Sequence, residues 1–211
     1  MPDREGNSVP LFRIGAKELD YLRKKDKKLG LAIDRIGPLE REIIPDLFTA
    51  LIRNIVAQQI SKEAMITIWG RMRERFGDIT PARFGPLSAE EIQACGMSMR
   101  KAEYICGVSR SAAEGTLDLA ALQDLPDEEV IERLSSLRGV GPWTAEMLLI
   151  FSMERPNVLS YGDLAIRRGI MTLYGHKTLD RERFERYKKR YSPYGSTASL
   201  YLWEISAGGI K

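Results

Sequence analysis

Apolar residues recur along most of the chain at steps of one, three and four positions, the spacing that places them on one face of an α-helix. The clearest case follows Pro45 and Asp46, two residues that suit a first helical turn, and comprises Leu47, Leu51, Ile52, Ile55 and Val56. The same reasoning predicts helices over 61–75, 98–114, 118–124, 127–136, 142–153, 163–173, 181–190 and 196–206. Alternating strand patterns are nearly absent, so the sequence predicts an all-α fold.

Local signals mark several helix ends. Gly77 is expected to stop the helix over 61–75, and Ser88 with Glu91 has the spacing of a capping box ahead of the next helix. The basic run 22–28 is expected to be the solvated face of a helix. The stretch 188–194 combines basic and aromatic residues, which suits a phosphate track beside a base pocket. No internal repeat or low-complexity linker interrupts the chain.

Composition narrows the class of protein. The 211 residues are 44% hydrophobic and 29% charged, which is typical of a globular protein with a substantial core. The net charge of +3 is too slight to indicate nucleic-acid binding by itself, so any basic surface must be local.

Several classes of site are disfavoured. Two cysteines and one histidine cannot supply a disulfide framework or a four-thiolate iron–sulfur cluster, and they make a structural zinc site improbable. The start, Met1 to Gly6, shows no signal peptide, and no apolar run reaches the ~20 residues that a membrane helix needs. A cytoplasmic or nucleoid-associated protein is therefore expected, without membrane attachment.

The segment 137–145, Leu-Arg-Gly-Val-Gly-Pro-Trp-Thr-Ala, lies between two predicted helices. Gly139 and Gly141 allow a tight turn whose backbone can approach a ligand closely. The turn presents the free amides of the next helix to an anion, for which a DNA phosphate is the natural candidate. Because two such glycines are a weak signal alone, an ordinary corner between helices is the alternative.

This segment resembles the hairpin of the helix-hairpin-helix DNA glycosylase superfamily, Leu-Pro-Gly-Val-Gly-x-x-Thr-Ala, and departs from it only at Arg138. The resemblance implies that Gly139, Val140, Gly141 and Thr144 bind phosphate. It also implies a Na⁺ or K⁺ ion on the backbone carbonyls of Ser135, Leu137 and Val140, and no other cofactor.

Trp143 stands where bifunctional members of that superfamily carry a Schiff-base lysine, and an indole cannot form an imine. The sequence is in this respect similar to the 3-methyladenine DNA glycosylase II branch, in which the tryptophan lines the base pocket. The resemblance therefore implies a monofunctional enzyme without lyase activity. A purely structural core aromatic is the alternative for Trp143.

Asp163 follows Trp143 by twenty positions, within Ser160-Tyr-Gly-Asp-Leu-Ala-Ile-Arg-Arg. Without a family it would be interpreted as a helix N-terminal residue, because Ser160 and Asp163 have capping-box spacing. The resemblance implies that Asp163 is the catalytic carboxylate. Departure of a base leaves an oxocarbenium-like sugar, which a fixed negative charge stabilises.

The segment Ala57-Gln-Gln-Ile-Ser61 resembles the superfamily's wedge loop, with Gln59 as the plug that fills the space of a flipped nucleotide and Gln58 as its neighbour. Surface or capping amides are the alternative. Trp143 and Tyr194 are expected to stack on the base, with Met147 and Leu164 completing a pocket that has fewer aromatic walls than the branch often has.

We therefore expect two helical lobes with an active-site cleft between them. Residues 45–154 would carry the wedge and the helix-hairpin-helix motif, and 1–44 with 155–211 would carry Asp163. The expected activity is excision of 3-methyladenine and 7-methylguanine from double-stranded DNA by a monomer. The alternatives are a glycosylase for uracil, hypoxanthine or mismatched bases, and a DNA-binding hairpin module without catalysis.

Overall fold

A computed structural model describes residues 9–209; residues 1–8, on which the expectation of no signal peptide rests, and residues 210–211 lie outside the described part. Over the described residues there is no strand, only an isolated bridge between Leu11 and Glu42, so the all-α prediction is confirmed. The elements are α1 (Ala16–Lys25), α2 (Lys27–Ile36), α3 (Leu47–Ala57), α4 (Lys62–Phe76), α5 (Pro81–Phe84), α6 (Ala89–Gln93), α7 (Met99–Ala113), the 3₁₀ helix η1 (Ala121–Asp124), α8 (Asp127–Ser135), α9 (Pro142–Phe151), α10 (Leu164–Tyr174), α11 (Arg181–Tyr191) and α12 (Gly195–Ala207).

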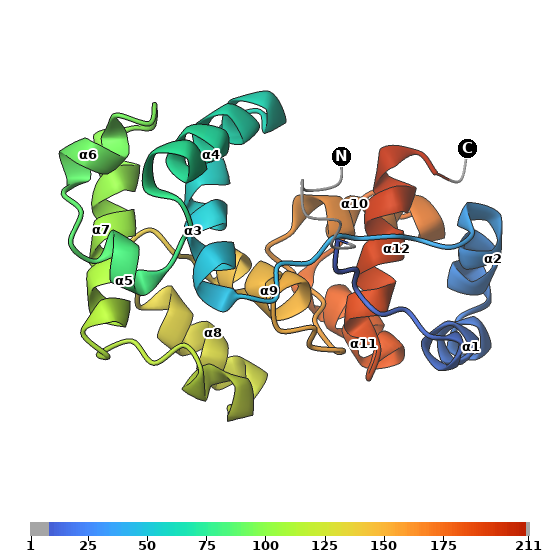
Figure 1. Ribbon diagram of the computed structural model, residues 1–211. Helices are drawn as coiled ribbons and strands as arrows, with labels where there is room; N and C mark the ends of the chain where they lie inside the picture. The colour runs from blue at the N-terminus through green and yellow to red at the C-terminus, as the bar shows by residue number, and fades with distance from the viewer. Residues whose placement is uncertain (1–8, 210–211) are drawn as a thin grey trace. The chain divides into compact units, whose positions relative to one another are not determined.

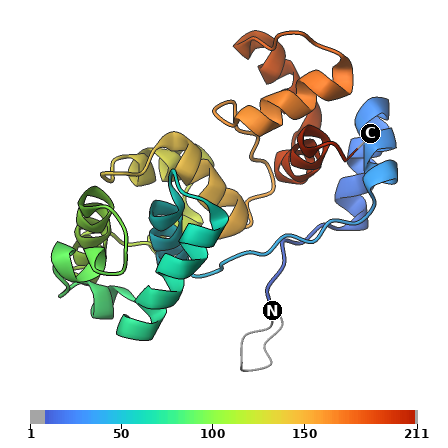
Figure 2. The same cartoon turned by 90° about the horizontal axis from the view of Figure 1, so that it is seen from above.

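The chain divides into two compact units. One comprises Ile44–Leu148, and the other Met1–Ile43 together with Leu149–Lys211. The first contains α3 to α8 and most of α9, and the second contains α1, α2 and α10 to α12, which bring the two ends of the sequence into one unit (Figures 1 and 2).

In the unit 44–148, α7 packs against α3, α5 and α6, and α3 also packs against α4 (Figure 1). Helices α3 to α7 each begin where an aspartate, serine or threonine side chain accepts a hydrogen bond from a first-turn amide. Ser88 and Glu91 form the complete predicted capping box, and Gly77 ends α4. The core consists of apolar side chains from these faces, including Leu51, Ile52, Ile55, Met72, Phe84, Ile92, Ile105 and Val130.

In the other unit α12 is the central helix, in contact with α1, α2, α10 and α11 (Figure 1). Its residues 195–202 are all buried. Gly169 of α10 permits a close approach to α12, because a Cβ atom there would lie 2.2 Å from the Leu202 carbonyl oxygen. This contact fixes the position of α10, at whose start Asp163 lies.

Three local predictions were wrong. The basic run 22–28 does not form one helix, because it is broken at Asp26, which is buried and caps α2; Lys24, Lys25, Lys27 and Lys28 are exposed, as expected. Asp46 precedes α3 as its cap rather than lying in its first turn. Only Ala121–Asp124 of the expected 118–124 helix is helical, because the Asp118 side chain accepts from the Ala121 amide and the segment forms a 3₁₀ turn.

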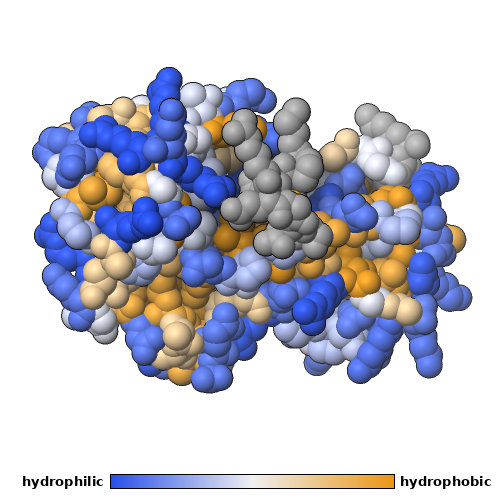
Figure 3. Space-filling view, in the orientation of Figure 1, coloured by the Kyte–Doolittle hydropathy of each residue, from blue (hydrophilic) through white to orange (hydrophobic). Residues whose placement is uncertain are grey.

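The surface of both units is mixed in polarity, with hydrophilic side chains projecting widely on the face drawn in Figure 3. Among the described residues, the large apolar side chains that are exposed are Val9, Leu11, Leu31, Ile66, Trp143 and Leu164. No helix in the described part is long and apolar enough to cross a membrane.

Candidate functional site

The predicted hairpin forms a tight turn between α8 and α9. The Val140 amide donates to the Leu137 carbonyl at 3.1 Å, and Gly139 has a φ of +86°, which favours glycine. Val140 and Thr144 are buried. Around Gly141, by contrast, a Cβ atom would meet no heavy atom within 4 Å. The turn is thus packed against the protein at Gly139 and open at Gly141.

The predicted wedge turn is held to the hairpin by its own side chain. The Nε2 atom of Gln58 donates to the Gly139 carbonyl oxygen at 2.7 Å. Gln59 beside it is exposed and has a φ of +54°, a conformation that is uncommon for a residue other than glycine. Gln58 therefore holds the wedge turn against the hairpin, and Gln59 is exposed to solvent.

Lys101, on α7, was not predicted from sequence and supports the same turn. Its ammonium group donates to the carbonyl oxygens of Val56 and Gln58 at 2.8 and 2.5 Å. Burial lowers the pKa of this ammonium group. The two carbonyls belong to the end of α3, where backbone acceptors have no further partner within the helix. Lys101 thus closes α3 and fixes the start of the wedge turn.

Asp163 is the N-cap of α10. It is buried, with 6% relative exposure, and its Oδ1 accepts from the Ile166 amide at 2.8 Å. The cap is therefore Asp163 itself, and the expected capping-box role of Ser160 is wrong. A helix N-terminus stabilises a negative charge, so this position suits a carboxylate that must act as an anion.

The loop before Asp163 is fixed by the first turn of α12. The Ser196 hydroxyl accepts from the Val158 amide at 3.0 Å, and the Ser199 hydroxyl donates to the Val158 carbonyl at 2.9 Å. The Gly195 amide donates to the Asn157 side chain at 3.3 Å. These bonds satisfy buried backbone groups that no secondary structure pairs. They fix the position of the loop that leads to Asp163 within this unit.

The four residues predicted to line the base pocket differ in exposure. Trp143 and Leu164 are 45% and 49% exposed, each in the first turn of its helix, whereas Met147 is 6% exposed. Tyr194 is half-buried and contacts Tyr21 edge-to-face, with ring centroids 5.2 Å apart.

Tyr21 also donates a hydrogen bond from its hydroxyl to the Ser192 carbonyl at 2.6 Å. A residue of α1 thereby positions the segment that carries Tyr194. Sequence reasoning gave Tyr21 no role, and its contact partners lie more than 170 positions away along the chain.

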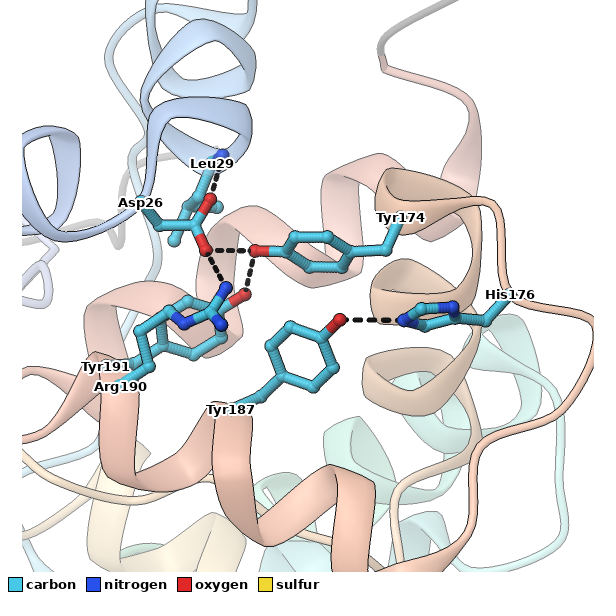
Figure 4. Close-up of polar contacts among 7 residues, drawn as sticks. All are labelled: Asp26, Leu29, Tyr174, His176, Tyr187, Arg190 and Tyr191. Carbon is cyan, nitrogen blue, oxygen red and sulfur yellow. Dashed lines mark hydrogen bonds and ion pairs between the residues drawn. The ribbon is translucent and has the colours of Figure 1, made fainter.

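A buried polar network joins α2, α10 and α11 (Figure 4). The Asp26 carboxylate accepts from the Leu29 amide, the Tyr174 hydroxyl and the Arg190 guanidinium at 3.0, 2.5 and 2.7 Å. Burial would raise the pKa of Asp26, but these hydrogen bonds outweigh it and the pKa lies below its ordinary value. Tyr191 is fully buried and its hydroxyl lies 2.8 Å from that of Tyr174.

This network involves two residues of the stretch 188–194 that was interpreted as a phosphate track. Arg190 pairs with Asp26, because a buried carboxylate requires a paired charge, and Tyr191 lies in the core, whereas Lys188 and Lys189 are exposed. The network thereby fixes Tyr174, the last residue of α10, which Asp163 caps at its other end, and Arg190 near the end of α11, which leads into Tyr194.

Over the described residues, no group of three or more histidine, cysteine, aspartate or glutamate side chains is arranged to hold a metal ion. The hairpin carbonyls of Ser135, Leu137 and Val140 form a different kind of candidate. The Ser135 hydroxyl near them is buried and has no hydrogen-bond partner among these residues.

The family model for HhH-GPD superfamily base excision DNA repair proteins matches residues 52–193, which include the wedge turn, the hairpin and Asp163. The chain is 32% identical over 169 residues to the putative DNA-3-methyladenine glycosylase YfjP of Bacillus subtilis, covering 74% of this chain and 58% of that relative's length. It is 30% identical over 164 residues to DNA-3-methyladenine glycosylase 1 of Schizosaccharomyces pombe, with 75% and 72% covered.

Solved structures similar to this chain include members of the same family. The crystal structure of a DNA-3-methyladenine glycosidase from Bacillus halodurans has a TM-score of 0.82 and 34% identity, with 93% of this chain and 92% of that chain covered. Schizosaccharomyces pombe Mag1 in complex with abasic DNA has a TM-score of 0.77 and 27% identity, with 90% and 96% covered. The predicted resemblance is confirmed: this chain belongs to the HhH-GPD superfamily of base excision DNA repair proteins, in its 3-methyladenine DNA glycosylase branch.

Proposed function

We propose that this protein is a monofunctional DNA glycosylase that excises alkylated bases, chiefly 3-methyladenine and 7-methylguanine, from double-stranded DNA. The observation that carries the proposal is Asp163, a buried carboxylate held at a helix N-terminus inside the region matched by the family model. The similar proteins named above support the substrate class, because their names refer to 3-methyladenine.

In the proposed mechanism the unit 44–148 binds the DNA backbone through the open side of its hairpin, and Gln59 fills the space of the flipped nucleotide. Asp163 then stabilises the positive charge that develops on the sugar as the base departs, and it orients or deprotonates the attacking water. Cationic alkylated purines leave without a strong general acid, so a single carboxylate suffices for them.

The pocket residues Trp143, Tyr194, Met147 and Leu164 are proposed to contact the flipped base, the first two by stacking. Trp143 offers no amine, so we propose hydrolysis without strand cleavage. The protein would act as a monomer on cellular DNA.

The hairpin carbonyls of Ser135, Leu137 and Val140 are proposed to hold Na⁺ or K⁺. The buried Ser135 hydroxyl without a partner among the described residues is compatible with a ligand at this turn. When bound, the cation would add positive charge beside a DNA phosphate.

The test is base release from a panel of duplexes that each carry one lesion, with wild-type protein and Asp163→Asn. Asparagine also caps helices, so this variant can keep the hydrogen bond from the Ile166 amide while it removes the negative charge. We expect DNA binding to persist and base release to fall at least about a hundredfold, the effect of losing electrostatic stabilisation at a transition state.

Asp180→Asn is the matched control. Asp180 caps α11 in the same way, its carboxylate accepting from the Arg183 amide at 2.7 Å, and it lies on the surface. Its variant should release bases like the wild type. Near-wild-type release by Asp163→Asn would refute the mechanism, and binding without release by wild-type protein would indicate a non-catalytic module. Faster release of uracil than of 3-methyladenine would move the protein to another substrate class.

A further inference from the structure

Two arginines flank the hairpin without a carboxylate partner. The guanidinium carbon of Arg138, within the hairpin, lies 5.8 Å from the centre of the Tyr104 ring, and that of Arg100, on α7, lies 5.6 Å from the same centre. The Arg100 side chain also donates to the Tyr104 hydroxyl. Both arginines are exposed, and in the described residues neither forms an ion pair.

Tyr104 fixes this pair in place beside the turn. Its ring is packed so closely on Gly139 that a Cβ atom there would lie 2.1 Å from a ring carbon. An aromatic ring attracts guanidinium groups, and arginine stacked on a ring loses less freedom when it binds an anion. The two positive charges are therefore preorganised around one half-buried side chain instead of moving freely in solvent.

Two other arginines of the same unit lie near carboxylates. Arg133, on α8, pairs with Glu129 at 2.6 Å, and Arg83 lies 3.9 Å from Asp78. The chain has a net charge of only +3, so a nucleic-acid surface has to be a local concentration of unneutralised cations. The Arg100–Tyr104–Arg138 cluster is such a concentration, and it directly adjoins the open turn at Gly141.

We propose that this cluster is a second phosphate-binding site of the protein, in which Arg100 and Arg138 each contact a backbone phosphate next to the one bound by the hairpin amides. The proposal rests on the proposed function, because it assumes that the hairpin binds DNA. Guanidinium groups match phosphate geometry with paired donors. Such contacts add affinity for any sequence and do not distinguish damaged from undamaged duplex.

The salt dependence of DNA binding tests this site. Fluorescence anisotropy with a labelled undamaged duplex gives the slope of log K against log salt concentration for wild type, Arg100→Gln, Arg138→Gln and the double variant. Each single variant should reduce the slope by about 0.9 and the double variant by about 1.8, which corresponds to roughly eightfold weaker binding per arginine at about 0.1 M salt. Arg110→Gln, exposed in the last turn of α7, is the control with an unchanged slope.

Charge-retaining variants guard against a purely structural effect. Arg100→Lys and Arg138→Lys should keep the wild-type slope, because lysine also neutralises a phosphate. Slopes that are unchanged in both glutamine variants overturn the site, as do slopes that fall equally in the lysine variants. Base release by wild-type protein is measured separately, so failure of this site leaves the glycosylase proposal standing, and absence of base release leaves the salt test valid.

Discussion

The two glycines of the hairpin should respond in opposite ways to the same substitution. Gly139 and Gly141 lie two positions apart in one turn, but a Cβ atom at Gly139 would lie 2.1 Å from the Tyr104 ring, whereas one at Gly141 would meet nothing within 4 Å. Gly139 has a φ of +86°, and the φ of Gly141 lies outside the left-handed region. Alanine at each position therefore separates packing of the turn from its approach to DNA.

The expected magnitudes follow from these surroundings. Alanine in a left-handed conformation costs about 1–2 kcal/mol, and displacing a packed ring costs about 1–3 kcal/mol more. Gly139→Ala should thus lower the free energy of unfolding by about 2–5 kcal/mol. Gly141→Ala should leave it unchanged or raise it by up to about 1 kcal/mol, because alanine restricts the unfolded chain.

Urea unfolding followed by circular dichroism measures the free energy of unfolding. Fluorescence anisotropy with damaged and undamaged duplexes measures DNA binding. Gly141→Ala should fold like the wild type and bind both duplexes more weakly, because its methyl group occupies the space through which a phosphate would approach the backbone. Wild-type stability of Gly139→Ala would refute the packing argument. Wild-type binding by Gly141→Ala would show that phosphate does not approach there, and loss for one lesion alone would place this glycine in the base pocket.

Three further predictions concern single residues. Because Trp143 has no amine, borohydride should trap no covalent complex with DNA, and abasic products should persist until alkali is added; a trapped complex would reveal lyase chemistry. Lys101→Met should lower the free energy of unfolding by about 1.5–3 kcal/mol in urea, since it removes a charged donor from the carbonyls of Val56 and Gln58. Asp26→Asn should destabilise the protein at pH 7 and progressively less below about pH 4, because a carboxylate with a lowered folded pKa stabilises the fold only while ionised; a difference in unfolding free energy that stays constant down to pH 2 would contradict this.

Features that depend on neighbouring residues were predictable from the sequence. The capping box of Ser88 and Glu91 and the stop at Gly77 arise within one or two helical turns, so the residues themselves specify them. The hairpin and Asp163 were recognised for the same reason, because each motif is a short segment with fixed spacing.

Features that depend on residues far apart along the sequence were not predictable from it. Nothing near Asp26 in the sequence indicates that it interrupts the helix predicted for the basic run. The groups that stabilise its buried charge, Tyr174 and Arg190, lie 148 and 164 positions later. Nothing in the local sequence singles out Lys101, because its acceptors lie 43 and 45 positions before it. A weak signal existed for Tyr104, which follows Arg100 by four positions and therefore shares its helix face.

The N-terminal helices matter to the site although they precede the segment 52–193 that the family model matches. Asp26 holds Tyr174 at the end of α10 and Arg190 near the end of α11, and Tyr21 holds the carbonyl of Ser192 just before Tyr194. Without this N-terminal segment, Tyr174 and Arg190 would lose the Asp26 carboxylate that accepts their hydrogen bonds. Because α10 starts at Asp163, a shift at its far end would be transmitted along a rigid helix to the carboxylate. Residues of the N-terminal helices and of the junction between them are therefore part of the support of the proposed catalytic residue.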